Sequence, residues 1–167
     1  MKKVLGFFVV LLALICLCSC ASTQKPVKHV YIASPFFNVT EYDNVVYVES
    51  VLEERGLSYF SPMRHTVDGE AGSLDWAYKT FEVDRTEILK ADAVVAIYYG
   101  SEGDTGTAWE CGYAIANNIP VILVHVDVDN GSNLMVNCGS TTNITLEDLI
   151  NYDFDNLPIY EYEGMMI

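Results

Sequence analysis

Three carboxylates, Glu102, Asp104 and Glu110, lie in and just after a glycine-rich stretch between two apolar, β-branched runs. This stretch has no basic residue, and it lacks both the GxxxxGKS/T and the GxGxxG spacing of a phosphate-binding loop. Carboxylates without a cation suit acid/base or nucleophilic chemistry, whereas anion binding needs positive charge. We therefore expect a catalytic site built from carboxylates.

Two of these acids also have structural interpretations. Thr107-Ala108-Trp109-Glu110 fits a capping box, in which Glu110 reaches back to the N–H group at the helix start. Taken alone, this spacing favours a helix cap. Asp104, which stands just before Gly106, could equally bind backbone N–H groups of its own loop.

Asp84 is another carboxylate in an unusual position. It falls in residues 73–91, the best helical pattern of the chain, on the stripe expected to face inward with Leu74, Ala77, Tyr78, Phe81, Ile88 and Leu89. A buried carboxylate is costly unless it is paired or faces a cavity. Asp84 is therefore an ion-pair partner of Arg85 or Lys79, a residue at the edge of the buried face, or part of a functional site.

The elements that must position these acids alternate between strand and helix. Helical periodicity predicts helices at 41–55 and 73–91, and apolar runs predict buried strands at 29–33, 57–61, 93–99 and 120–126. The acidic stretch follows a buried strand and precedes a short helical pattern, as in a βαβ unit of a parallel sheet. Ligands bind at the carboxyl ends of such strands, where this stretch lies.

The remaining segments have weaker patterns. Residues 62–73 predict a long loop, and loops of that length are often functional. A turn-rich loop with the apolar island Asn133-Leu134-Met135 follows residue 126, and Thr145 is expected to cap a short helix at 145–151. The aromatic and apolar tail after residue 151 predicts docking on its own domain or on a neighbouring subunit.

The amino terminus has the pattern of an export signal. Two lysines precede an apolar run and small residues, and the tetrad Leu17-Cys18-Ser19-Cys20 resembles a bacterial lipobox. We expect a signal peptide at 1–19, a tether at 20–28 that begins with lipidated Cys20, and one domain at 29–167. The alternatives are an uncleaved anchor, an ordinary signal, or a cytoplasmic protein if the signal is not used.

Charge and cysteine usage narrow the function classes. The formal net charge of −14 becomes −16 without residues 1–19, which carry two lysines and no acids, so nucleic acid polymers are unfavourable partners. Cys111 and Cys138 remain beyond the export signal, and Cys111 is expected to be a buried thiol. The three histidines have no metal-ligand spacing, so we predict no metal.

Five motifs in one order resemble the nucleoside 2-deoxyribosyltransferases over nearly all of 29–167. They are VYIASPFF, the helix with Asp84, DTGTAWECGYAIANNIPVILV, NLM and YEG. The resemblance implies an α/β, flavodoxin-like doubly wound fold with a mainly five-stranded parallel sheet and helices on both faces. It also implies a homo-oligomer, deoxynucleosides and free nucleobases as substrates, and no cofactor.

The resemblance also implies roles for individual residues, and it outweighs the capping interpretation of Glu110. Glu110 would be the nucleophile that forms a covalent deoxyribosyl-enzyme with retention of configuration, and Tyr31 would orient its carboxylate. Asp84 and Asp104 would contact the substrate and protonate the leaving base. The substrate-binding residues would be Ala33, Phe36 and, from the neighbouring subunit, Asn133 and Met135.

Two features depart from the family. The chain ends in Ile167, whereas better-known members end in an aromatic residue, so the base preference is left open. Those members also have no export signal.

One alternative function is an N-glycosidase acting on deoxynucleosides or nucleoside 5′-monophosphates, although Asp104 would repel a phosphate. Another is a non-catalytic, nucleoside-binding lipoprotein, which would not need a carboxylate at position 110.

Overall fold

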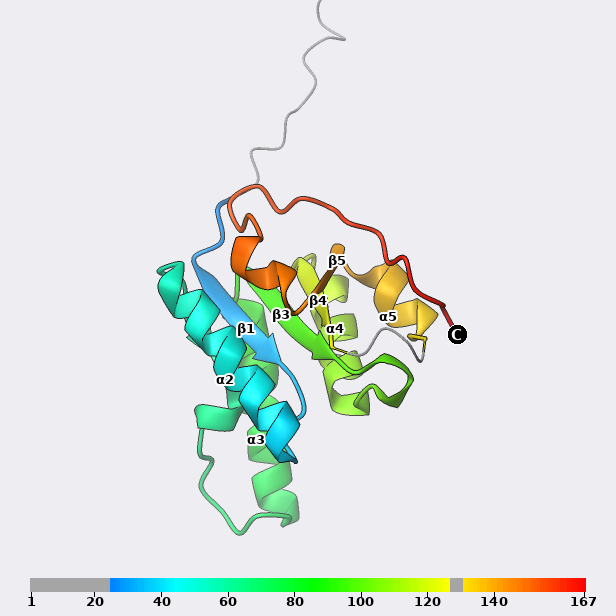
Figure 1. Cartoon of the computed structure of the whole chain (residues 1–167). Helices are drawn as coiled ribbons and strands as arrows, with labels where there is room; N and C mark the ends of the chain where they lie inside the picture. The colour runs from blue at the N-terminus through cyan, green and yellow to red at the C-terminus, as the bar shows by residue number, and fades with distance from the viewer. Residues whose placement is uncertain (1–24, 127–130) are drawn as a thin grey trace, which may run out of the picture.

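A parallel β-sheet forms the centre of the computed structural model, which describes residues 25–126 and 131–167 (Figure 1). Its five strands lie in the order β2-β1-β3-β4-β5. Their bounds are β1 (His29–Ala33), β2 (Ser58–Phe60), β3 (Ala93–Tyr98), β4 (Val121–His125) and β5 (Thr142–Thr145). This order is that of the flavodoxin-like doubly wound fold, so the predicted fold class is confirmed.

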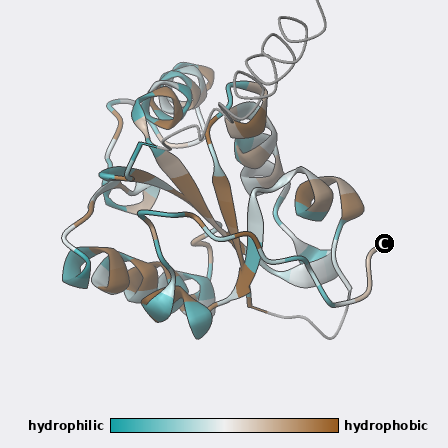
Figure 2. Ribbon diagram, turned by 90° about the horizontal axis from the view of Figure 1, so that it is seen from above, coloured by the Kyte–Doolittle hydropathy of each residue, from teal (hydrophilic) through white to brown (hydrophobic). Residues whose placement is uncertain are grey.

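Helices cover both faces of the sheet, as the view along it shows (Figure 2). The α-helices are α2 (Val39–Glu54), α3 (Leu74–Lys90), α4 (Thr105–Ala116) and α5 (Leu134–Gly139), and the short 3-10 turns are η1 (Pro62–Arg64), η2 (Gly100–Glu102) and η3 (Asp148–Asn151). Helix α2 and η3 pack on one face, and α3, α4 and α5 pack on the other. Among the described residues, no helix is long and apolar enough to cross a membrane.

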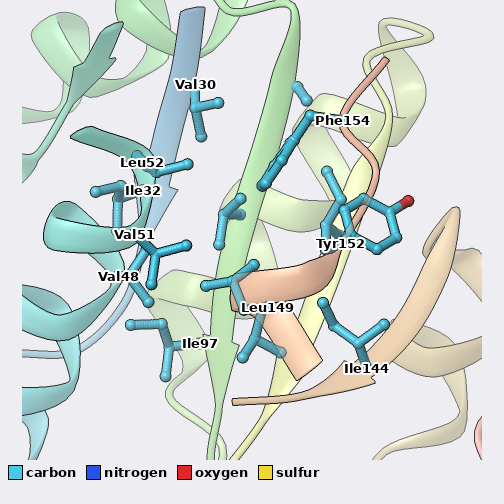
Figure 3. Packing of buried hydrophobic residues seen from close by; sticks show 14 of the residues in the cluster. Val30, Ile32, Val48, Val51, Leu52, Ile97, Ile144, Leu149, Tyr152 and Phe154 are labelled. Atoms are coloured by element: carbon cyan, nitrogen blue, oxygen red, sulfur yellow. The ribbon is translucent and has the colours of Figure 1, made fainter. Parts of the chain in front are cut away.

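Alternation along the strands divides the core into two clusters. Val30 and Ile32 of β1 join the cluster beneath α2, whose packing Figure 3 shows, while Tyr31 and Ala33 join the cluster beneath α3 and α4. Each fully buried aliphatic side chain contributes about 1.5–3 kcal/mol of transfer free energy, so a one-residue slip of β1 would be costly. The same alternation fixes Tyr31 on the face that carries α4.

Helix α3 shows where the predicted inward stripe is wrong. Leu74, Tyr78 and Phe81 are 72%, 65% and 43% exposed, whereas Ile88 near the end of the helix is buried. Leu89, next to Ile88 and also predicted to face inward, is 45% exposed. The first turns of α3 extend past the strands, so only the later turns have a sheet to pack on (Figure 1). The apolar residues at the start of α3 therefore lie on the surface of the single chain.

Two short elements replace the turn-rich loop expected after residue 126. Helix α5 has six residues and β5 has four, which is too short for a periodic pattern to show. Thr145 ends β5 instead of capping an α-helix, and the turn that follows is the 3-10 turn η3. The Thr145 hydroxyl accepts a hydrogen bond from the Asp148 N–H group at 3.2 Å, so Thr145 keeps part of its predicted capping role.

Both ends of the described chain contact the domain. Val27, in the expected tether, is buried, and Asp92 accepts hydrogen bonds from Lys25 Nζ and from the N–H groups of Lys28 and His29. At the other end, the Ile167 N–H group donates to the Ser132 carbonyl at 2.9 Å. The tail therefore docks on its own domain, one of the two predicted outcomes. Cys20 and the predicted signal peptide lie outside the described residues.

Candidate active site

A hydrogen bond between Tyr31 and Glu110 joins β1 to α4. The Tyr31 hydroxyl donates to Glu110 Oε1 at 2.6 Å, and the Tyr31 side chain is fully buried. Glu110 lies in the second turn of α4 and is half-buried. The carboxylate is thus held by one strong donor next to the carboxyl half of the sheet.

Asp104, not Thr107, caps α4. Its Oδ2 atom accepts the Thr107 N–H group at 2.7 Å and lies 3.1 Å from the Thr107 hydroxyl. The helix begins at Thr105, so Thr107 lies inside its first turn, and the capping-box interpretation of Glu110 is wrong. The interpretation of Asp104 as an acid that binds backbone N–H groups is confirmed.

Asp84 reaches the same site from α3. It is half-buried and forms no ion pair within residues 25–126 and 131–167, because Lys79 pairs with Asp75 at 2.6 Å and Arg85 with Glu82 at 2.7 Å. Burial raises the pKa of Asp84 to about 6, although the positive charge of nearby His65 acts in the opposite direction. Both ion pairs proposed for Asp84 are therefore excluded in this structure.

Burial and like charges also act on Glu110. Burial raises its pKa to about 8, with Asp84 and Asp104 adding to the rise, and the Tyr31 hydrogen bond opposes it. Burial and the Glu110 charge raise the pKa of Tyr31 far above its usual value, so Tyr31 stays a donor. Glu110 is thus a carboxyl group whose ionised form is stabilised by the Tyr31 hydrogen bond. Asp84, in the same site, is a carboxyl group that binds a proton at higher pH than an exposed aspartate does.

Two aromatic residues that the sequence did not indicate complete this site. Phe60 at the end of β2 stacks on Tyr31 with ring centroids 5.8 Å apart, and His65 packs on Phe60 at 5.2 Å.

Arg64, next to His65, forms hydrogen bonds of 2.6–3.1 Å with Glu49, which is a buried acid of α2. This ion pair fixes the start of the loop at 62–73, whose length was its only signal in the sequence.

The predicted substrate-binding residues of β1 lie at its carboxyl end. Ala33 is buried in the same cluster as Tyr31. Phe36 follows in the next loop, where it is 37% exposed and stacks on Phe37 with ring centroids 5.6 Å apart. An exposed aromatic surface is therefore available close to the strand that carries Tyr31.

Asn133 and Met135 line a different cavity. Asn133 caps α5 by accepting the Met135 N–H group at 2.9 Å, and Met135 is 75% exposed. Both residues border a cavity of about 440 Å³ with Tyr98, Gly103 and Ile167, which Glu110 does not line. The single chain therefore does not bring these two residues to Glu110, and their place in a neighbour's site stays a prediction.

The chemistry of the site is that of its carboxyl groups. No three His, Cys, Asp or Glu side chains of the described residues converge as metal ligands. Cys111 is a buried free thiol, as predicted, and burial raises its pKa to about 12, so it is not a nucleophile at neutral pH. The arrangement offers one carboxylate for attack and one acid for proton donation.

A family model and two curated proteins match this chain. The model described as nucleoside 2-deoxyribosyltransferase matches residues 30–153. The nucleoside deoxyribosyltransferase of Lactobacillus johnsonii is 32% identical over 93 residues, or 54% of this chain and 62% of that protein. That of Lactobacillus leichmannii is 33% identical over 91 residues, or 53% of this chain and 58% of that protein. The chain thus matches about three fifths of the length of these relatives.

Solved structures show the same fold. A 2-deoxyribosyltransferase from Bacillus psychrosaccharolyticus superposes with a TM-score of 0.71 and 35% identity, covering 80% of this chain and 98% of that one. A CMP N-glycosidase from Clostridium botulinum gives a TM-score of 0.53 at 22% identity, covering 74% of this chain and 95% of that one. The second likeness concerns the fold alone.

Proposed function

Because the chain belongs to the nucleoside 2-deoxyribosyltransferase family, we propose that it transfers a 2-deoxyribosyl group between nucleobases, as an enzyme of nucleoside salvage. The observation that carries this proposal is the 2.6 Å hydrogen bond from Tyr31 to Glu110. A buried tyrosine that holds a half-buried carboxylate in one orientation is what a nucleophile needs. A protein that only bound nucleosides would have no use for this arrangement.

In the first step, a Glu110 oxygen forms a bond to C1′ of the deoxynucleoside. The bond from C1′ to the base nitrogen breaks, and its electron pair leaves with the base. The transition state resembles an oxocarbenium ion, and the product is a deoxyribosyl ester of Glu110. Tyr31 keeps one carboxylate oxygen in place while the other attacks.

The leaving base needs a proton, and Asp84 is placed to donate it. Its pKa of about 6 means that it holds a proton more readily than an exposed aspartate does. In the second step, a nitrogen of the incoming base attacks C1′, its proton passes to Asp84, and Glu110 leaves as the carboxylate. Two inversions give net retention.

The protonation states set a condition on this mechanism. Attack requires ionised Glu110, whose pKa is about 8, together with protonated Asp84, whose pKa is about 6. The productive form is thus the minor one of a coupled pair, and turnover should peak between these two values. The Tyr31 hydrogen bond increases this form, because it stabilises the Glu110 anion.

We propose nucleosides, not nucleotides, as the substrates. Asp104 places a further negative charge close enough to raise the pKa of Glu110, and it would repel a 5′-phosphate. The arginines nearest the site are already engaged, since Arg64 pairs with Glu49 and Arg85 with Glu82. Hydrolysis of nucleoside 5′-monophosphates, the alternative in the same fold, would therefore find neither of these two arginines free to bind the phosphate.

For assembly, we propose a homo-oligomer in which a neighbour completes each site. Leu134 and Met135 are 47% and 75% exposed, and the start of α3 exposes Leu74 and Tyr78. A soluble single chain seldom leaves so much apolar surface uncovered. A contact between copies would cover it and could carry Asn133 and Met135 toward the Glu110 of the neighbour.

For location, we propose export and anchoring to a membrane by lipidated Cys20, on the lipobox-like tetrad alone. The measurement is fractionation of cells that express the Cys20→Ser variant. Loss from the membrane fraction, or an unprocessed precursor, supports the proposal. A variant that is cleaved before position 20 and stays membrane-bound contradicts it.

The test of the function is chromatography of products from the full-length chain. Thymidine with adenine should give deoxyadenosine and thymine, and dAMP should remain unchanged. Release of thymine with free 2-deoxyribose and no deoxyadenosine would indicate a glycosidase, and cleavage of dAMP would indicate nucleotide hydrolysis. Binding of thymidine without any product would indicate a binding protein.

A further inference from the structure

A second cavity lies at the carboxyl ends of β4 and β5. It has a volume of about 730 Å³ and is bordered by His125 and Thr145, the last residues of these two strands, by η3, and by residues 160–164 of the tail. None of Tyr31, Asp84 and Glu110 lines it, so it is separate from the candidate active site. Its volume is in the range of pockets that bind small molecules.

The tail is fixed on both sides of this cavity. The Tyr160 carbonyl accepts the Asn143 N–H group at 2.9 Å, and further along Ser132 donates to the Met165 carbonyl at 2.8 Å. Figure 1 shows the end of the chain, drawn orange to red, running past β5 to α5. A Cβ atom at Gly164 would overlap the Tyr162 ring, so glycine permits the close approach there. The wall at 160–164 is therefore a built part of the fold.

His125, which borders the cavity, holds a buried ring nitrogen without a donor. The side chain is 4% exposed, and its Nε2 atom lies 3.0 Å from Asn143 Oδ1. Because Asn143 Nδ2 donates to the Asn137 carbonyl, Oδ1 faces the ring and Nε2 carries the proton. Nδ1 is then an acceptor, and it has no partner among the described residues. Burial lowers the pKa of His125, which keeps the ring neutral at pH 7.

The rest of the lining is acidic and aromatic. Asp148, Glu161 and Glu163 border the cavity, and no described residue that lines it is a lysine or an arginine. The Tyr162 ring stacks on His125 with centroids 4.4 Å apart, and Tyr160 presents a ring that is 53% exposed. Carboxylates and tyrosine rings attract organic cations, whereas they repel anions such as nucleotides.

We propose that this cavity binds a small organic cation that carries N–H groups, of the class of linear polyamines. An ammonium N–H group would donate to His125 Nδ1, and the positive charges would lie between Glu161, Glu163 and the tyrosine rings. This cavity shares no residue with the candidate active site, so its proposed ligand does not depend on the proposed transfer reaction.

Isothermal titration calorimetry of the full-length protein with spermidine tests this proposal. The variant Glu161→Gln/Glu163→Gln should weaken binding at least about tenfold, because both substitutions lie on the exposed rim and remove charge there. The matched control is Glu54→Gln/Asp155→Asn, which changes the net charge equally at exposed positions outside the cavity. This control and Glu110→Gln should bind spermidine as the wild type does.

The acceptor on His125 has its own test. His125→Phe keeps a ring for stacking on Tyr162 and removes Nδ1, so spermidine should bind at least about fivefold more weakly. Fully N-methylated, quaternary spermidine keeps the charge without N–H groups, and it should bind the wild type more weakly than spermidine does. The proposal is overturned if millimolar spermidine does not bind, or if the rim variant and the control variant weaken binding equally.

Discussion

The Tyr31 hydroxyl lies 2.6 Å from Glu110 Oε1 and connects the middle of β1 to the second turn of α4. The Tyr31 ring is itself fixed by stacking on Phe60 and by complete burial. Movement of either element would therefore change the orientation of the carboxylate. This bond has consequences for the pH dependence of activity, for stability and for the covalent step.

Tyr31→Phe removes the donor and keeps the ring on Phe60. Because the hydrogen bond lowers the pKa of Glu110, its loss should raise this pKa further above that of Asp84, which makes the productive form rarer. The alkaline limb of the kcat profile should therefore move to higher pH, and kcat at pH 7 should fall by about 10–100-fold. Tyr59→Phe is the matched control, since Tyr59 donates to Glu53 on the surface. An unchanged alkaline limb with unchanged kcat in Tyr31→Phe would contradict the role assigned to this bond.

Glu110→Gln should stabilise the protein at alkaline pH. Burial raises the pKa of Glu110 from 4.5 to about 8. The unfolded chain thus releases this proton at lower pH than the folded protein does, and the wild type loses stability as pH rises between these values. Glutamine carries no such cost. The Tm gain of the variant should be at least about 3 °C larger at pH 8.5 than at pH 5.

Thermal melts of wild type, Glu110→Gln and the exposed control Glu54→Gln at both pH values measure this difference. The control should follow the wild type. A Tm difference between Glu110→Gln and wild type that does not change with pH would show that Glu110 titrates in the folded protein as an exposed glutamate does.

Asp84→Asn should separate catalysis from folding. Asp84 has no ion pair in the described chain, so the Tm should change little, whereas kcat should fall by about 10²–10⁴-fold with the loss of the proton donor. Asp75→Asn, which breaks the Lys79 pair on the same helix, is the control for helix stability. A large loss of Tm with turnover preserved would assign Asp84 a structural role.

Mixing two inactive variants tests the shared site. Asn133→Ser keeps an oxygen that can cap α5 but shortens the side chain, and Glu110→Ala removes the nucleophile. If a dimer shares its sites, random mixing should restore about a quarter of the wild-type activity, because half of the dimers then hold one intact site. Sedimentation should show an oligomer, and a fully active monomer would contradict shared sites.

The sequence predicted the elements with long or repeated patterns. The apolar run at His29–Ala33 correctly predicted β1. An acid among apolar residues marked Asp84, although the apolar stripe around it was misplaced. Periodicity reports which side of a helix is apolar, but it does not report how far the helix extends beyond its sheet. For that reason Phe81 was predicted as buried and is 43% exposed.

The parts that the sequence did not predict depend on tertiary contacts or on short elements. Phe60 and His65 join the site by stacking between a strand and a loop, and no spacing in the chain records this contact. The sequence suggested Thr107 as the helix cap and Asp104 as a loop acid, and only the position of the first helical turn shows that Asp104 is the cap. The elements α5 and β5 gave no pattern because six and four residues are too few for a periodic pattern to show.

The covalent step is the central claim, and mass spectrometry tests it most directly. A 2-fluoro-substituted deoxynucleoside slows both oxocarbenium-like steps. When no acceptor base is added, the second step also lacks its nucleophile, so an intermediate should accumulate on the full-length protein. The account predicts a mass gain of one fluorinated deoxyribosyl group, located on Glu110 by peptide mapping, and its absence in Glu110→Gln, whose activity should fall at least about 10³-fold. A label on another residue, or a Glu110→Gln protein as active as the wild type, would contradict the account.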